Sequence, residues 1–272
     1  MLEILDQGPF VTPTLVVALD GWVNAGSAGT LAAEVIAGSD AVPVARFDSD
    51  LLYDYRMLRP SIDFQDGVLS SVAWPQLSVT RVAWEGRDIL VMTGSEPNWN
   101  WQRMCGALVD AARAWGVVEF VGVGGVPWAA PHTRPVTVMT TSTSPDRLTG
   151  VHPEGLLRVP GAAVSAFEHA MALAGVATIG FWARVPNYVG AAFPAAALAV
   201  AERVGDHLGL DFDTADLAVS AKEQRTQLDD LVAQRADVSA MVEQLEQLYD
   251  TSDVVSGEDL AAEIERFLRD QR

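Results

Sequence analysis

Short runs of β-branched and other apolar residues alternate with alanine-rich stretches through the first 210 residues of this 272-residue chain. Several runs are apolar throughout, as strands buried on both faces of a sheet are, and the intervening stretches carry apolar residues at helical spacing. This alternation predicts an α/β fold with a parallel sheet. The ranges expected to form strands are 14–19, 42–47, 88–93, 117–123, 136–141 and 176–183. The ranges expected to form helices are 25–37, 99–115, 162–174 and 193–208.

The region 66–85 departs from this pattern. Its residues alternate in polarity around Gly67, Pro75 and Gly86. Short alternating runs separated by such turn residues are typical of hairpins. We therefore expect meander strands or a hairpin beside the parallel sheet.

The charge balance limits the class of partner. The chain carries 36 acidic and 18 basic residues, a formal net charge of −18. Attraction to the phosphate backbone is the main source of nucleic-acid affinity, so nucleic acid and anionic membranes are not expected partners. The longest apolar run, 185–201, contains Asn187 and Pro194 and falls short of the roughly 20 apolar residues of a membrane span.

The cysteine count indicates the compartment. Cys105 is the single cysteine, which excludes an internal disulfide framework and agrees with a reducing environment. Residues 1–10 include Glu3 and Asp6 and lack the basic start and apolar stretch of a signal peptide. We expect a cytoplasmic protein.

The composition changes after Asp213, where glycine and tryptophan are absent for a stretch and Asp, Glu, Gln and Arg dominate. We place a boundary near Asp211, which gives an α/β body over 1–210 and a helical C-terminal appendage over 211–272. From Leu217 to Tyr249 apolar residues recur at 4,3 spacing, which predicts one amphipathic helix about 50 Å long. Gln224 and Arg235 interrupt its apolar seam.

Two interpretations of the appendage remain open. In the first it folds back on its own α/β body, and in the second it forms a coiled-coil or subunit contact. Ser256 and Asp259 resemble a capping box, after which Leu260 and Ile264 indicate a last short helix.

Polar residues after each expected strand are the candidates for a site, because ligands of open α/β sheets bind at the carboxyl ends of the strands. A glycine-rich turn follows the first strand, and its free N–H groups could hold a carboxylate or phosphate. The alternative is a tight strand-to-helix turn that needs small residues for packing. The candidate ligand-binding residues of this turn are Asp20, Gly21, Asn24, Gly26 and Ser27. A nucleophilic role for Ser27 is a further, weaker hypothesis.

Other strand ends supply candidate acids, bases and cations. Glu96 follows the third strand and could act as a base or serve as a helix N-terminal acid. The proline-rich loop after the fourth strand presents His132 and Arg134 at the same edge. Further on lie Glu154 and the pair Asn187 and Tyr188. The catalytic candidates are Glu96, His132 and Glu154, and the other ligand-binding candidates are Arg134, Asn187 and Tyr188.

No motif requires a metal or cofactor. His132, His152 and Glu154 lack the close spacing of metal ligands, and the glycine-rich turn is neither a dinucleotide fingerprint nor a phosphate-binding P-loop. We expect no metal and no cofactor.

Five loop segments carry a resemblance when taken in order. They read ALDGWVNAG at 18–26, TGSEP at 93–97, GGVP at 124–127, HTRP at 132–135 and VPNY at 185–188. Together they resemble the proteasome assembly chaperone 2 family, in particular its bacterial members of actinobacterial type, whose function is uncharacterised. The resemblance covers about residues 10 to 250.

This resemblance implies a three-layer α/β/α body similar to nucleoside phosphorylases, with a small helical C-terminal part. It also implies self-association as a dimer or trimer, or pairing with a homologous subunit. Eukaryotic and archaeal members are scaffolds for the assembly of proteasome α-subunits. Members can dock through a C-terminal tail of hydrophobic residue, tyrosine and any residue, whereas this sequence ends in Arg269-Asp270-Gln271-Arg272, so docking by that route is not expected.

Two functions follow. The first is a non-catalytic, chaperone-like scaffold that acts through protein–protein contacts. The alternative is a small-molecule enzyme or sensor that binds an anionic or nucleoside-like ligand at the carboxyl edge of the sheet. The alternative requires the candidate residues to converge around a concavity.

Overall fold

The computed structural model describes residues 1–84 and 86–251. The strands are β1 Leu2–Ile4, β2 Thr14–Asp20, β3 Val42–Phe47, β4 Ser61–Gln65, β5 Val68–Ala73, β6 Leu77–Trp84, β7 Arg87–Ser95, β8 Glu119–Trp128, β9 Val138–Thr141 and β10 Ala177–Pro186. The helices are α1 Ala28–Ala37, α2 Ser49–Leu52, α3 Trp101–Trp115, α4 Ala163–Leu173, α5 Pro194–Leu208, α6 Ala215–Ala233 and α7 Ala236–Thr251. All six ranges expected as strands and all four expected as helices contain the corresponding element, so the α/β prediction is confirmed.

Eight strands form one mixed sheet in the order β1-β3-β6-β7-β2-β8-β10-β9. The four central strands β7, β2, β8 and β10 are parallel. Outside them, β6 and β9 pair antiparallel with β7 and β10, and β3 and β1 extend the sheet in the same antiparallel manner. The four parallel strands end at the same edge, which is where a site is expected in such sheets.

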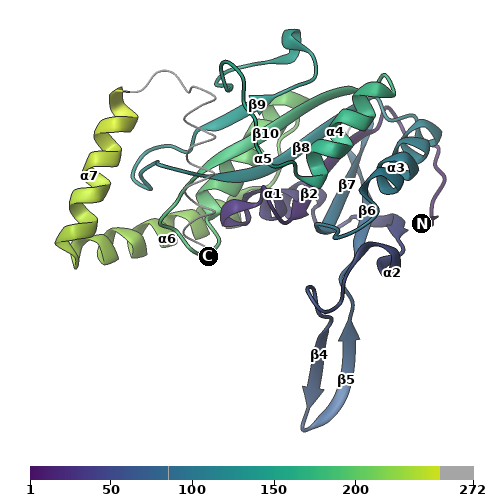
Figure 1. The fold of residues 1–272 in the computed structure, drawn as a ribbon, viewed down its shortest axis with the longest axis horizontal. Helices are drawn as coiled ribbons and strands as arrows, with labels where there is room; N and C mark the ends of the chain where they lie inside the picture. Colours follow the sequence, from purple (N-terminus) through teal and green to yellow (C-terminus); the bar gives the residue numbers. More distant parts are fainter. Residues whose placement is uncertain (85, 252–272) are drawn as a thin grey trace.

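Helices cover both faces of this sheet (Figure 1). Along β2, Leu15 and Val17 belong to the core under α3 and α4, whereas Val16 and Ala18 belong to the core under α1 and α5. All four side chains are fully buried. Alternation of this kind places consecutive strand residues on opposite faces, and the result is a helix–sheet–helix body of three layers. The likeness to nucleoside phosphorylases stays a prediction.

A two-stranded hairpin, β4 and β5, projects from the body as a separate small sheet (Figure 1). The hairpin and the adjoining β6, which joins the main sheet, confirm the expectation for the region 66–85. Both strands of the hairpin are exposed along their whole length.

Short elements and interruptions were not expected. The three-residue β1 and the four-residue α2 are too brief for a periodicity to show. The helix expected over 25–37 is instead a 3₁₀ turn, Ala25–Ser27, followed by α1, because Gly26 and Ser27 adopt positive φ values of 60° and 54°. Among the described residues, no helix is long and apolar enough to cross a lipid bilayer.

The prediction of one helix from Leu217 to Tyr249 was wrong, because the chain turns between α6 and α7 at Gln234 and Arg235. Arg235, in this turn, pairs with Asp237 in the first turn of α7. A guanidinium at a seam position is not readily buried, whereas Val242 and Leu245, which follow at the same 4,3 spacing in α7, are buried.

The described part of the appendage, residues 211–251, folds back on the body, as the first of the two interpretations predicts. Leu217 of α6 is buried, α6 packs against α5, and α7 rises at a steep angle from the end of α6 (Figure 1). The boundary near Asp211 stays a prediction, and the expected last short helix lies outside the described residues.

Candidate functional site

The glycine-rich turn after β2 is held together by the side chain of Asn24. Its Oδ1 accepts hydrogen bonds from the backbone N–H groups of Gly29, at 3.0 Å, and Thr30, at 3.2 Å, and its Nδ2 donates to Asp20 Oδ1 at 3.2 Å. Asn24 therefore caps the first turn of α1 and satisfies N–H groups that an anion would otherwise use.

Small residues in this turn allow backbone to approach backbone. A Cβ on Gly29 would lie 2.7 Å from the carbonyl oxygen of Val123 in β8, and one on Gly26 would lie 2.8 Å from Cβ of Phe193. These contacts agree with the packing interpretation of the turn. Anion binding by Asp20, Gly21, Asn24, Gly26 and Ser27 stays a prediction.

Glu96 connects two strand-end segments. Its Oε2 accepts a hydrogen bond from the Trp22 N–H at 3.0 Å, and its Oε1 accepts one from the Ala163 N–H, the first residue of α4, at 2.6 Å. A Cβ on Gly21 would lie 2.4 Å from Cβ of Glu96, so residue 21 must be small. Both carboxylate oxygens bind main-chain N–H groups, and the Ala163 bond places negative charge at a helix N-terminus.

His132 lies at the centre of a second group of contacts. The fully buried His132 ring contacts the Tyr188 hydroxyl through Nδ1 at 2.7 Å and Asp229 of α6 through Nε2 at 3.2 Å. Arg225 of α6 donates to the His132 carbonyl oxygen at 3.0 Å and pairs with Asp229. Burial lowers the pKa of His132 below its ordinary value and outweighs the opposing effect of the Asp229 carboxylate.

Arg134 attaches α7 to the same loop. Its Nη1 lies 3.0 Å from Glu246 Oε1, and its Nη2 lies 2.8 Å from Asp250 Oδ2. Thr133 also donates to Glu246, and the Tyr249 hydroxyl donates to the Pro135 carbonyl oxygen at 3.0 Å. The guanidinium lowers the pKa of Asp250 below its ordinary value. The loop 132–135 thus binds both C-terminal helices.

The structure brings some candidates together and separates others. His132 contacts Tyr188, which follows β10, and Arg134 lies in the same loop as His132. The Asn187 N–H donates to the Trp128 carbonyl oxygen at 3.0 Å. Glu96 binds the segments before α1 and at the start of α4 instead, and Glu154 is exposed in the segment after β9. Catalytic roles for Glu96, His132 and Glu154 stay predictions.

Arg184 is a buried cation that was not among the candidate residues chosen from the sequence. Its guanidinium lies over the Trp128 ring, 4.6 Å from the ring centre, and its Nε and Nη2 atoms are buried and have no hydrogen-bond partner among the described residues. Burial lowers its pKa to about 10. An arginine at the end of an apolar strand-like run was the available signal.

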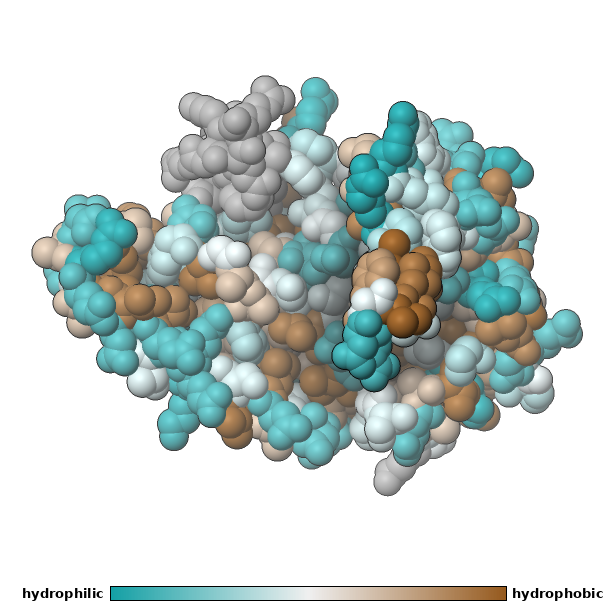
Figure 2. Space-filling model, turned by 90° about the horizontal axis from the view of Figure 1, so that it is seen from below, coloured by the Kyte–Doolittle hydropathy of each residue, from teal (hydrophilic) through white to brown (hydrophobic). Residues whose placement is uncertain are grey.

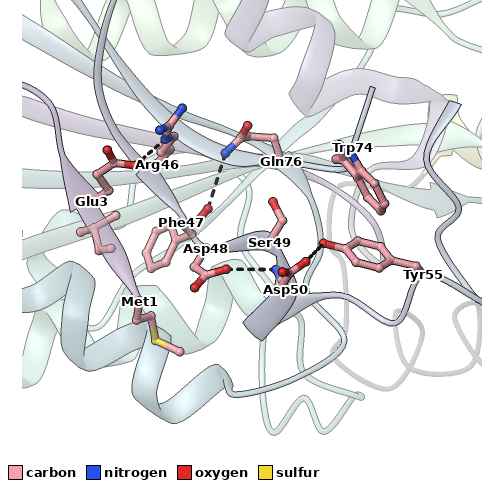
Figure 3. A pocket seen from close by; sticks show the side chains of 11 residues that line it. Met1, Glu3, Arg46, Phe47, Asp48, Ser49, Asp50, Tyr55, Trp74 and Gln76 are labelled. Carbon is pink, nitrogen blue, oxygen red and sulfur yellow. Dashed lines mark hydrogen bonds and ion pairs between the residues drawn. The ribbon is translucent and has the colours of Figure 1, made fainter. Parts of the chain in front are cut away.

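A hollow lies between β1, the carboxyl end of β3 and the base of the hairpin. It has a volume of about 680 Å³. Its polar side chains bind one another: Arg46 pairs with Glu3, and the Tyr55 hydroxyl donates to Asp50 at 2.6 Å (Figure 3). Trp74 stands edge-on to Tyr55, with ring centres 4.8 Å apart, on the hairpin side of the hollow.

In the described residues, no three His, Cys, Asp or Glu side chains are grouped closely enough to hold a metal ion.

Comparison with known proteins supplies the family. Residues 18–232 match the model of the PAC2 family. The chain belongs to the PAC2 family. The resemblance drawn from the five loop motifs is thereby confirmed.

Solved structures of similar proteins cover 84% to 100% of this chain. A protein of unknown function from Mycobacterium tuberculosis is 34% identical over 100% of this chain and 96% of its own, with a TM-score of 0.86. One of unknown function from Corynebacterium glutamicum is 29% identical over 92% and 97%, with a TM-score of 0.86. A proteasome-assembly chaperone homologue from M. tuberculosis is 31% identical over 84% and 99%, with a TM-score of 0.78. No curated protein matches this sequence.

Acidification is expected to weaken the attachment of the C-terminal helices of this PAC2 chain. The pKa of His132 is lower in the folded than in the unfolded protein, so the unfolded state binds more protons and the stability contributed by neutral His132 is lost as the pH falls from about 6.5 through the folded pKa. Urea midpoints between about pH 7 and pH 5 should therefore fall less steeply for His132→Gln than for the wild type.

The matched control for this pH series is His169→Gln, since His169 is exposed on α4. His207, whose pKa burial also lowers, is present in all three proteins, so the difference in slope isolates His132. Equal slopes for wild type and His132→Gln would contradict the prediction.

Proposed function

We propose that this PAC2 protein is a non-catalytic, chaperone-like scaffold that acts through protein–protein contacts and associates first with a second copy of itself through the β4–β5 hairpin. The observation that carries the proposal is the open apolar face of this hairpin. The single cysteine, buried as a free thiol, supports a reducing compartment such as the cytoplasm.

The hairpin is amphipathic. Ile62 pairs with Val72, and Phe64 pairs with Leu69. Directly opposed residues share a face, and so do residues two apart on one strand. A β-bulge opposite Asp63 and Phe64 takes up Ser70, which keeps Leu69 and Val72 on the same face. The other face carries mostly polar residues, so the apolar residues form one stripe.

This stripe is open to solvent. The exposed fractions are 49% for Ile62, 64% for Phe64, 53% for Leu69 and 40% for Val72. Figure 2 views the molecule from the side on which the hairpin projects, and hydrophobic surface gathers on the part nearest the viewer. An isolated two-stranded hairpin is marginally stable in water, and clustered exposed apolar side chains mark interaction sites.

A second copy of the chain suits this surface. Two chains that each carry a net charge of −18 repel one another, so self-association requires an interface with few charges. The stripe of Ile62, Phe64, Leu69 and Val72 is uncharged. It continues toward the hollow at the hairpin base through Trp74, which is 54% exposed.

The comparisons support the chaperone-like part of the proposal. A relative 31% identical to this chain is described as a proteasome-assembly chaperone homologue. The small-molecule alternative is less favoured, since Glu96 and Arg134, its proposed base and anion partner, already bind groups of the chain itself.

The test is the mass of the purified protein by light scattering, for the wild type and for the double variant Phe64→Ser and Leu69→Ser. We expect a dimer or trimer for the wild type and a monomer for the double variant, because the substitutions remove two of the largest apolar groups of the stripe.

The matched control is Val68→Ser. Val68 is 69% exposed but pairs with Gln65 on the other face of the hairpin. The mass of the Val68→Ser protein should therefore equal that of the wild type. A monomeric wild type, or an oligomer that survives the double substitution, would remove the hairpin as the interface.

A further inference from the structure

A second cavity, of about 340 Å³, lies between α4, the ends of β8–β10 and the segment 153–160. Its wall is mainly apolar and includes Trp22, Met139, Leu157 and Trp182. It is within the size range of small-molecule sites, which are mostly apolar concavities with a few polar groups. None of the candidate residues singled out in the sequence lines it.

The Trp182 ring can line the cavity because the strand residues beneath it are glycines, which have no side chain. A Cβ on Gly180 would lie 2.8 Å from the Trp182 ring, and one on Gly124 would lie 3.0 Å from it. The indole Nε1 donates to Thr141 Oγ1 at 2.8 Å. Glycine weakens a strand, and it often marks a place where another group must approach closely. Here the glycines let one rigid indole lie against the sheet and line the cavity.

Glu168 of α4 supplies the one carboxyl group among the described residues that line this cavity. Glu168 is only 7% exposed. Its hydrogen-bond partner in the described part of the chain is the Thr178 hydroxyl, at the long distance of 3.5 Å. That hydroxyl is also 2.8 Å from Thr143 Oγ1. Buried carboxyl groups normally have short, well-aligned partners, so this carboxyl group lacks a strong donor.

Burial raises the pKa of Glu168 above its ordinary value, because the carboxylate loses hydration that the long bond to Thr178 does not replace. A bound cation would restore the charged form and supply the missing donor. Neither Lys nor Arg is among the described residues that line the cavity. His169 also lines it, but this residue is exposed.

We propose that this cavity binds a small aromatic amine, with the planar ring against the Trp182 indole and the ammonium group donating to the Glu168 carboxylate. The apolar walls account for the ring, and the buried acid without a strong donor accounts for the cation. This site lies apart from the β4–β5 hairpin, so it does not depend on the proposed self-association.

The experiment is a ligand-observed NMR titration of the full chain with tryptamine, and with indole-3-propionate as the same ring carrying a negative charge. Saturable binding of tryptamine and at least tenfold weaker binding of indole-3-propionate are expected. Glu168→Gln should weaken tryptamine about tenfold or more, the effect of losing a charge-assisted hydrogen bond. It should leave the affinity for indole-3-propionate unchanged or increased.

Two further variants keep the result interpretable. Ser165→Phe introduces a ring at an exposed residue of α4 that lines the cavity, so it should abolish binding of tryptamine without touching the core. Glu202→Gln removes an exposed acid from α5, on the other side of the sheet, and should bind as the wild type does. No saturable tryptamine binding by the wild type, or equal binding by the wild type and Ser165→Phe, would overturn the proposal.

Discussion

Gly124→Ala is expected to cost about 3 kcal/mol or more in the free energy of unfolding. The new Cβ would lie 2.2 Å from the Val23 carbonyl oxygen and 3.0 Å from the Trp182 ring. The same Val23 carbonyl oxygen accepts a hydrogen bond from the Gly125 N–H at 2.8 Å. Neither backbone nor a packed indole can move aside cheaply, so the contact between β8 and the turn after β2 must open.

The measurement is the urea midpoint, compared with that of Gly161→Ala. A Cβ on Gly161 meets no atom within 4 Å and its φ is not positive, so this substitution should change stability by no more than about 0.5 kcal/mol. Equal midpoints for the two variants would show that the close approach at Gly124 is not a packing constraint.

Glu96→Ala is expected to lower stability by about 2–4 kcal/mol, because the Trp22 and Ala163 N–H groups would both lose a charged acceptor. Glu96→Gln should cost less, since its carbonyl oxygen retains one of these bonds while its NH₂ group faces the other donor. Urea unfolding monitored by circular dichroism measures both.

The control is Glu154→Ala, which removes an exposed carboxylate of the same chemical type and should be neutral. The contrast separates a structural role for Glu96 from a purely catalytic one. A Glu96→Ala protein as stable as Glu154→Ala would contradict the bridging role.

The strands and long helices could be predicted because their sequences are locally consistent. The run 15–19 is apolar throughout since β2 is buried on both faces, and the helices between strands carry apolar residues at helical spacing. The turn at Arg235 shows the limit: the 4,3 spacing continues across it, so the spacing alone does not reveal that the helix ends there.

The positions of the candidate side chains could be predicted better than their partners. His132 and Arg134 were expected at the carboxyl edge of the sheet, and they are there. Their partners Asp229, Glu246 and Asp250 lie about a hundred positions further along the chain, and no local pattern specifies such a contact. The cavity at Trp182 was missed for the same reason, although the alternation of Gly122 and Gly124 with valines in β8 was visible.

The hairpin occupies the connection from β3 to β6, two strands that pair directly with each other. The main sheet is therefore continuous at the base of the hairpin, where Ser49 Oγ donates to the Pro75 carbonyl oxygen at 2.7 Å. An excursion anchored in this way is modular. Its length and side chains can change without altering the strand register beneath it, so the surface that the hairpin presents can vary without rebuilding the fold.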